Sequence, residues 1–290
     1  MSPCSQALGP FEALFARADF AGKVHARSYW QGRELLLLQT GKMQAVISLQ
    51  GAQLLHFQPA AERPWLWCST LWPQQGPIRG GIPLCWPWFG AHPQGLALPS
   101  HGWARLQDWQ LTELQSHDDE VSLSWSLALD DWSAEVQMRL GETLSVELKT
   151  VCLRATEVPL SQALHAYWQV SFLDNAQVTT LDGVTYHDKL DGVHKPQRGD
   201  VTFSQPLDRV YASGADLLLR DQGWQRTLQI AKRNSDSSVL WHPGRPGLPD
   251  APPVLAAGFV CVEVADGLQN HHVLAVGEQR ELGMHVQCSL

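Results

Sequence analysis

Short segments that alternate apolar and polar residues recur along this chain of 290 residues, and this pattern restricts the possible folds more than any other feature. Period-2 alternation predicts half-buried strands, because successive side chains of a strand point to opposite faces. Turn-forming pairs such as Asp130-Asp131 and Gly141-Glu142 separate the segments. The predicted strands cover residues 34–39, 45–49, 53–57, 121–127, 134–140, 144–152, 165–172, 177–181, 201–203, 216–219, 225–231, 238–242, 258–264 and 279–287. The sequence therefore predicts an all-β protein, a sandwich or barrel built from antiparallel hairpins.

Helices and domain boundaries leave few signals in this chain. Helical periodicity is convincing only over residues 6–17, so we expect few and short helices. Residues 243–253 are dense in Pro and Gly, which fits either a domain linker or a surface loop. We favour a loop near the mouth of a site, because the strand that follows carries a carboxylate in apolar surroundings. We predict one domain over residues 1–290, since single β domains often reach about 200–250 residues.

Composition excludes several classes of function. A hydrophobic content of 44% with 17% charged residues is ordinary for a globular protein that needs neither disulfides nor a metal to form its core. The net charge of −8 argues against a general nucleic-acid or membrane surface, because both require clustered Lys and Arg. No signal peptide or run of 18 apolar residues is found. We expect a cytoplasmic monomer that binds neither nucleic acid nor membrane.

The cysteines fit the same compartment. None of the six forms a Cys-x-x-Cys pair, and most lie in hydrophobic stretches, so we expect reduced thiols. They are Cys4, Cys68, Cys85, Cys152, Cys261 and Cys288.

Two stretches rich in Gly and Pro have the composition of an ordered pocket. They read Arg79-Gly-Gly-Ile-Pro-Leu-Cys-Trp-Pro-Trp-Phe-Gly90 and Leu98-Pro-Ser-His-Gly-Trp-Ala-Arg105. Gly allows close backbone approach and Pro fixes it, so we expect ordered loops, where functional residues are common. The forked guanidinium groups of Arg79 and Arg105 could bind phosphate, although a surface salt bridge is the more common role of an isolated arginine.

Glu263 and His165 are the candidates for acid–base chemistry. Glu263 lies in the apolar run Phe259-Val-Cys-Val-Glu-Val-Ala265, where burial raises the pKa of a carboxylate. The residues alone leave open whether Glu263 is structurally paired or catalytic. Alternation places His165 on one strand face with Tyr167 and Gln169, a polar face suited to a cleft wall. A lone histidine of this kind is more often a hydrogen-bonded core or rim residue.

The chain resembles the hexose-6-phosphate mutarotase (glucose-6-phosphate 1-epimerase) branch of the aldose 1-epimerase family. The matching elements are Arg-Gly-Gly-Ile-Pro (79–83), Pro-x-Phe-Gly (87–90) and His-Gly-x-Ala-Arg (101–105), and weaker similarity runs from Gly51-Ala52-Gln53 to Glu263. The resemblance implies a large antiparallel β-sandwich of the galactose mutarotase type. It also implies that the protein interconverts the α and β anomers of a hexose 6-phosphate, with no metal and no cofactor.

The same resemblance implies roles for individual residues. His165 would act as the acid and Glu263 as the base, while His101 would lie near the sugar ring oxygen. Arg79, Arg105 and Ser100 would contact the substrate, as would Asp208 in Pro206-Leu-Asp-Arg-Val-Tyr211. On the residues alone, His101 could equally fix its loop and Asp208 could be a turn or cap residue. The segment 181–189 also resembles the family, and we interpret it as mainly architectural.

Four tryptophans are candidates for packing on a sugar ring, because indole offers an apolar face and an N–H donor: Trp86, Trp88, Trp103 and Trp241. The sequence Trp241-His-Pro-Gly244 replaces an element that is often Trp-Asn-Pro-Trp in relatives, which leaves the substrate range open. Two alternatives therefore stand. One is a mutarotase for unphosphorylated aldoses, in which the arginines are structural, and the other is a non-catalytic carbohydrate-binding or sensing domain on the same fold.

Overall fold

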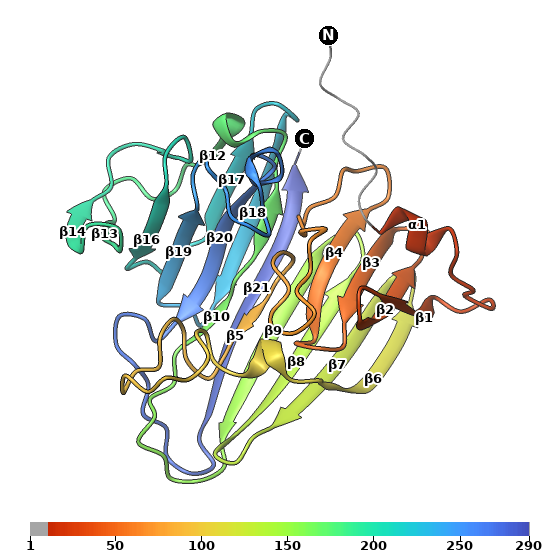
Figure 1. Cartoon of the computed structure of the whole chain (residues 1–290), viewed down its shortest axis with the longest axis horizontal. Coiled ribbons are helices and arrows are strands. Elements are labelled where there is room, and N and C mark those ends of the chain that lie inside the picture. The colour runs from red at the N-terminus through yellow and green to blue at the C-terminus, as the bar shows by residue number, and fades with distance from the viewer. Residues whose placement is uncertain (1–10, 290) are drawn as a thin grey trace.

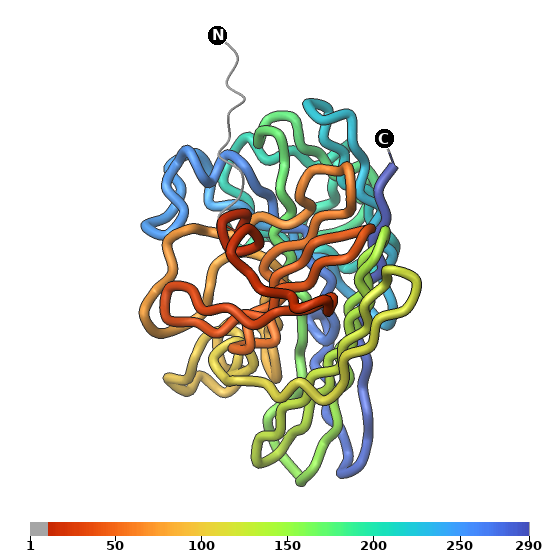
Figure 2. Tube along the Cα trace, turned by 90° about the vertical axis from the view of Figure 1, so that its right-hand side faces the viewer, coloured from red at the N-terminus to blue at the C-terminus, as the bar shows by residue number. Residues whose placement is uncertain are grey.

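The computed structural model describes residues 11–289, in which three antiparallel sheets form two layers (Figures 1 and 2). A four-stranded sheet has the order β1-β2-β3-β4, with β1 (His25–Trp30), β2 (Arg33–Gln39), β3 (Met43–Ser48) and β4 (Gln53–Pro59).

The second sheet has eight strands. They are β5 (Leu84–Cys85), β10 (Gln162–Leu164), β11 (Tyr167–Gln169), β13 (Thr185–Asp188), β14 (Val193–Pro196), β16 (Leu207–Tyr211), β19 (Ser237–His242) and β20 (Phe259–Asp266). Their order is β14-β13-β16-β19-β20-β10-β5, and β11 also pairs with β20.

The third sheet has nine strands. They are β6 (Gln110–His117), β7 (Glu120–Ala128), β8 (Trp132–Leu140), β9 (Leu144–Cys152), β12 (Ala176–Val178), β15 (Val201–Thr202), β17 (Leu217–Asp221), β18 (Arg226–Arg233) and β21 (Gln279–Ser289). Their order is β15-β12-β17-β18-β21-β9-β8-β7-β6.

The main core lies between the nine-stranded sheet and the other two. It takes fully buried residues from all three sheets, among them Ile47 of β3, Val146 of β9 and Val262 of β20. Strand β9 alternates strictly between buried and half-buried residues, as its period-2 pattern predicts. Strand β20 is buried along its whole length, because loops cover the face that points away from the core. The site lies on this second, covered face.

Helices are short in the described residues. They are α1 (Glu12–Phe15), η1 (Ala104–Leu106), η2 (Leu173–Asn175) and α2 (Pro253–Ala256). The helix predicted over residues 6–17 is thus present only at 12–15, and its residues 6–10 lie outside the described part of the chain. Among the helices of residues 11–289, none is long and apolar enough to cross a membrane.

The predicted fold class is confirmed, with local differences. Strand β6 was missed because it is an edge strand whose side chains are mostly exposed, so it shows no buried face in the sequence. Strand β1, another edge, was missed for the same reason. The Pro-rich residues 243–253 connect β19 to β20, which are neighbours in one sheet, so the segment is a loop and not a linker. The five cysteines of the described residues are unpaired.

Candidate active site

The centre of the site is a histidine–glutamate pair on adjacent strands. Leu164 pairs with Val264 and Tyr167 with Cys261, so this antiparallel register places His165 opposite Glu263. His165 sits between β10 and β11, where its backbone N–H donates to the Pro83 carbonyl. His165 Nε2 lies 3.4 Å from Glu263 Oε1.

Both members of this pair are buried and incompletely bonded. Glu263 is 1% exposed and His165 is 8% exposed. Neither Glu263 Oε2 nor His165 Nδ1 has a hydrogen-bond partner among the described residues. Buried polar atoms without partners are costly, and here two of them lie on side chains that face each other, which leaves both available to a ligand or a proton.

Burial moves the two pKa values toward each other. It raises the pKa of Glu263, and the nearby Asp208 carboxylate adds to this. It lowers the pKa of His165, and the neighbouring His101 ring and the charge of Arg105 add to that. In the free protein these directions favour a neutral pair that holds one proton. A pair that shares one proton contains one acid and one base, as reversible acid–base chemistry requires.

Arg79 is fixed on one side of the site by the Pro-rich loop. Its Nε donates to both carboxylate oxygens of Asp250 at 2.8 Å, and its Nη1 donates to the Tyr167 hydroxyl at 3.2 Å. The guanidinium group also lies 5.9 Å from the Trp241 ring centroid. Asp250 was not singled out from the sequence, because nothing local links it to an arginine so distant along the chain.

Residues of β4 fix the backbone next to Arg79. Gln53 Nε2 donates to the carbonyls of Ile78 and Gly80, which flank the arginine. Gly81 has φ +60°, and a Cβ at this position would lie 2.0 Å from the Leu54 carbonyl oxygen. Only glycine fits such a contact, which explains why the Gly-Gly pair follows the arginine.

Arg105 lacks the carboxylate partner that Arg79 has. Its Nη2 donates to the Ser100 carbonyl at 2.7 Å, while its Nε is buried without a partner. Of the described residues, none places a carboxylate oxygen within 4.0 Å of this guanidinium group. Ser100 itself has an exposed side chain and contacts Arg105 through its backbone. The positive charge of Arg105 is therefore the one left uncompensated beside the His165–Glu263 pair.

His101 combines the two alternatives that the sequence left open. Its Nδ1 accepts a hydrogen bond from the Gly90 backbone N–H at 3.3 Å, which ties the two motif loops together. Its ring also lies 5.9 Å from the His165 ring, centroid to centroid. Burial, with the charges of Arg105 and Lys189, lowers the pKa of His101 to about 3. A neutral ring whose Nδ1 accepts must carry its proton on Nε2, so His101 is a fixed donor.

Asp208 lies within β16, opposite Trp241 of β19, and is neither a turn residue nor a helix cap. Its Oδ1 is 3.6 Å from Lys189 Nζ, and burial raises its pKa. Lys189 follows β13, and our architectural interpretation of residues 181–189 missed its position at the site. The resemblance of that segment to the family was the signal available in the sequence.

The four tryptophans lie in three different environments. Trp241 is half-buried at the site, 6.3 Å from the ring of His165. Trp86 is fully buried, and its Nε1 donates to Thr150 Oγ1 within the core. The expectation that Trp86 packs on a sugar is therefore wrong, because no face of its ring is accessible. Trp88 and Trp103 line a separate depression together with Trp132, which our sequence reading did not anticipate.

His242 stands where relatives often have asparagine, and its role here is structural. Its Nε2 contacts the Ala256 carbonyl at 2.9 Å and its Nδ1 accepts from the Gly244 N–H at 3.0 Å. Burial lowers the pKa of this histidine, which is consistent with a neutral ring. It anchors the Pro-rich loop that carries Asp250 and thereby supports Arg79 indirectly.

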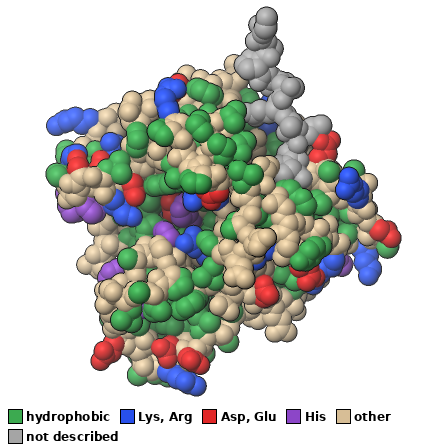
Figure 3. Space-filling model, viewed as in Figure 1, with side chains coloured by type: hydrophobic (Ala, Val, Ile, Leu, Met, Phe, Trp, Pro, Cys, Tyr) green, Lys and Arg blue, Asp and Glu red, His purple; other side chains and the backbone are tan. Residues whose placement is uncertain are grey.

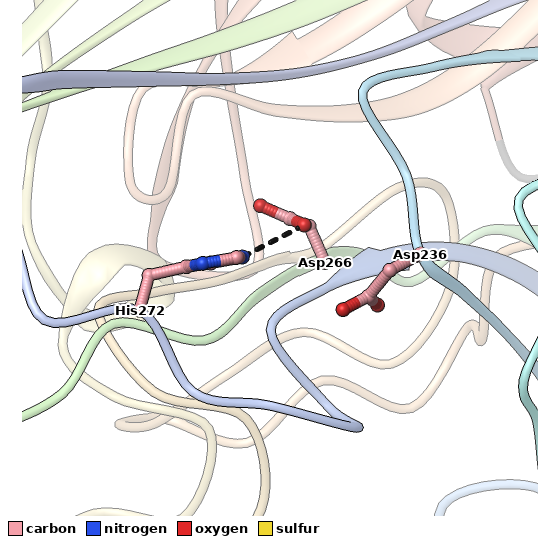
Figure 4. Close-up of side chains that lie close together, drawn as sticks. All are labelled: Asp236, Asp266 and His272. Carbon is pink, nitrogen blue, oxygen red and sulfur yellow. Dashed lines mark hydrogen bonds and ion pairs between the residues drawn. The ribbon is translucent and has the colours of Figure 1, made fainter.

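The described residues contain one group with the spacing of a metal site, and it lies elsewhere. Asp236, Asp266 and His272 place one ligand atom each within 4.8 Å of one another (Figure 4). Asp266 already accepts two hydrogen bonds from Arg280 and one from His272, so a cation would have to displace the arginine. We interpret this group as an ion pair that joins two sheets.

The space-filling view shows histidine and basic side chains gathered in a hollow near the middle of this face (Figure 3). The arrangement offers a buried acid–base pair, a fixed imidazole donor, a free guanidinium group and a half-buried indole. Such a set suits a small, polar, anionic ligand that undergoes proton transfer.

Comparison with known proteins gives a consistent result. The family model described as aldose 1-epimerase matches residues 34–287. A protein of Escherichia coli K12 with the name "Putative glucose-6-phosphate 1-epimerase" is 32% identical over 251 residues, which are 80% of this chain and 83% of that protein. A Salmonella typhimurium protein with the same name is 32% identical over 249 residues, 79% of this chain and 82% of that one. The crystal structure of a "putative mutarotase" from Salmonella typhimurium superposes with a TM-score of 0.85 at 28% identity, covering 96% of this chain and 98% of that one.

Proposed function

The chain belongs to the aldose 1-epimerase family, and from this premise we propose that it interconverts the α and β anomers of a hexose 6-phosphate, glucose 6-phosphate being the first candidate. The observation that carries the proposal is the buried His165–Glu263 pair, whose outer atoms have no partner. A structural pair would satisfy those atoms, whereas a catalytic pair keeps them for substrate.

The proposed reaction uses both members of the pair. Glu263 removes the proton of the anomeric hydroxyl, and His165 protonates the ring oxygen as the bond between that oxygen and C1 breaks. The open-chain aldehyde rotates about its C1–C2 bond and closes on the other carbonyl face, with both proton transfers reversed. His101, a fixed N–H donor, stabilises the charge that develops on the ring oxygen.

The competent state has carboxylate on Glu263 and imidazolium on His165, and it holds the same single proton as the neutral pair. The active form therefore differs from the neutral pair only in which of the two groups carries that proton.

Phosphate selectivity is assigned to Arg105. Asp250 balances the charge of Arg79, whereas Arg105 faces the site with no carboxylate partner among residues 11–289. An uncompensated guanidinium group is a strong site for a phosphate dianion. The relatives that carry glucose-6-phosphate 1-epimerase in their names support the same substrate class.

Anomer exchange measured by NMR on glucose 6-phosphate and on glucose tests the proposal. The wild-type protein should accelerate exchange of the phosphorylated sugar more. Arg105→Gln should raise KM for glucose 6-phosphate by about 10- to 100-fold and leave glucose unaffected, because a charged hydrogen bond to phosphate is lost.

Each outcome separates the alternatives. Acceleration of glucose alone would identify a mutarotase for unphosphorylated aldoses. No acceleration of either sugar would leave a binding or sensing domain as the explanation and overturn the enzymatic proposal.

A further inference from the structure

A second ion pair borders the site at the end opposite to Arg79. The row begins at Lys189, directly after β13, and continues by backbone pairing across four strands through Asp208, Trp241, Cys261 and Tyr167. Tyr167 contacts Arg79 through its hydroxyl. The Lys189–Asp208 and Arg79–Asp250 pairs thus lie at the two ends of one row, and His165 and Glu263 lie in the adjacent row.

The two ion pairs differ in how fully they are bonded. Arg79 and Asp250 are joined by contacts of 2.8 Å. Lys189 Nζ and Asp208 Oδ1 are 3.6 Å apart, beyond hydrogen-bond distance, and their side chains are 38% and 23% exposed. The lysine keeps donors available and the aspartate keeps acceptors available.

Lys189 also contacts the motif loop on the other side of the site. Its Nζ lies 5.5 Å from the Phe89 ring centroid, and Phe89 packs edge to face on His101 at 4.8 Å. The lysine therefore bridges β16 and the motif loop that carries His101. The charges of the pair reach Glu263, where Asp208 raises the pKa and Lys189 lowers it.

We propose that Lys189 is a specificity-determining residue, which together with Asp208 binds a ring hydroxyl of the sugar at the end of the site away from Arg79. This inference rests on the proposed function. A hydroxyl both donates and accepts, so Lys189 Nζ donates to its oxygen while Asp208 Oδ1 accepts its proton. With 3.6 Å between the two groups, both can reach a single ligand oxygen.

This pair distinguishes the configuration of a ring hydroxyl and does not bind the phosphate. A hexose 6-phosphate epimer with this hydroxyl inverted would leave the donor and the acceptor unpaired in a partly desolvated site. Such unpaired groups cost binding energy, so a site that recognises a hydroxyl discriminates against the epimer. Arg105 serves the phosphate, and so the two residues should control different features of the substrate.

Lys189→Met is the test variant, because it keeps the apolar stem and removes the charged donor. Lys195→Met is the matched control, since Lys195 lies on β14 of the same hairpin, pairs with Asp191 and is 39% exposed, close to the 38% of Lys189. Binding is measured calorimetrically on the wild-type background with equilibrated glucose, mannose and galactose 6-phosphates. Lys189→Met should weaken glucose 6-phosphate binding about tenfold and compress the differences between epimers, while Lys195→Met should change neither.

A second readout is the pH profile of kcat/KM. Without the lysine charge, the pKa of Glu263 rises further, so the acidic limb should move to higher pH in Lys189→Met and stay in place in Lys189→Arg. Unchanged affinity and unchanged epimer preference in folded Lys189→Met would overturn the inference. Sugar binding without any acceleration of anomer exchange by the wild type would overturn the proposed function instead and leave this inference intact.

Discussion

Strand β20 carries two buried carboxylates, each beside a histidine. Their surroundings shift the pKa values of the two groups in opposite directions. Glu263 lies 3.4 Å from His165 and keeps one oxygen without a partner. Asp266 lies 3.0 Å from His272 (Figure 4). Both of its oxygens also accept hydrogen bonds from Arg280 of β21. Residues 263 and 266 are an odd number apart, so they point to opposite faces of the strand.

The pKa values of Glu263 and Asp266 differ accordingly. Burial raises the pKa of Glu263, and no hydrogen bond offsets it. Burial acts on Asp266 in the same direction, but hydrogen bonds from Arg280 and His272 outweigh it and lower the pKa. A satisfied carboxylate holds the two sheets together, whereas an unsatisfied one costs stability and is available for chemistry. The comparison separates structure from function on a single strand.

The largest expected effect concerns the unsatisfied pair. Glu263→Gln and His165→Asn should each lower kcat/KM for glucose 6-phosphate by about 10²- to 10⁴-fold, the range that general acid–base groups supply. The double variant should lose little more than the worse single variant, because the two residues act as one unit. Steady-state rates from anomer exchange check this, and losses that add independently would contradict a coupled pair.

The satisfied carboxylate should affect stability and not chemistry. Asp266→Asn should lower the free energy of unfolding by about 2–3 kcal/mol, because it leaves the Arg280 charge without its partner, with some screening at the partly exposed arginine. The kcat of the folded variant should stay close to that of the wild type. Chemical denaturation measures the first quantity and NMR exchange the second. Glu263→Gln is the matched control, and it should be no less stable than the wild type.

The smallest expected effect is the pH dependence of the stability that Asp266 contributes, in the acid range. The folded-state pKa of Asp266 lies below its unfolded value of about 3.9, so its stabilisation is complete above that value and is lost as pH falls through the folded pKa. The stability difference between wild type and Asp266→Asn should therefore shrink below about pH 4. Glu263 has the opposite sign, since its raised pKa makes the folded state bind the extra proton. Denaturation at several pH values checks both, and a difference independent of acid pH would contradict the assignment.

Local patterning predicted most of the fold and one half of the site. Alternation predicted the strand face that carries Glu263, and the loop motif identified Arg105 and His101. The register that places His165 opposite Glu263 is a pairing between distant segments, which no local pattern contains. The same limit applies to Asp250, which reaches Arg79 from a loop 171 residues later.

Trp86 shows that the sequence of a loop does not predict which of its side chains are buried. Trp86 is a candidate for packing on a sugar in the sequence because it lies in a motif loop and an indole ring suits such a contact. The ring turns inward instead, where Thr150 of the nine-stranded sheet accepts its N–H. Which way a loop side chain turns depends on the opposite layer, and the sequence of the loop does not describe that layer.

Anomer exchange of glucose 6-phosphate, measured by NMR in the wild type, Glu263→Gln and Asp266→Asn at equal concentrations of folded protein, tests the central claim most directly. We predict acceleration by the wild type and by Asp266→Asn, with exchange in Glu263→Gln close to the rate in buffer. Acceleration retained in Glu263→Gln, or lost in folded Asp266→Asn, would contradict it.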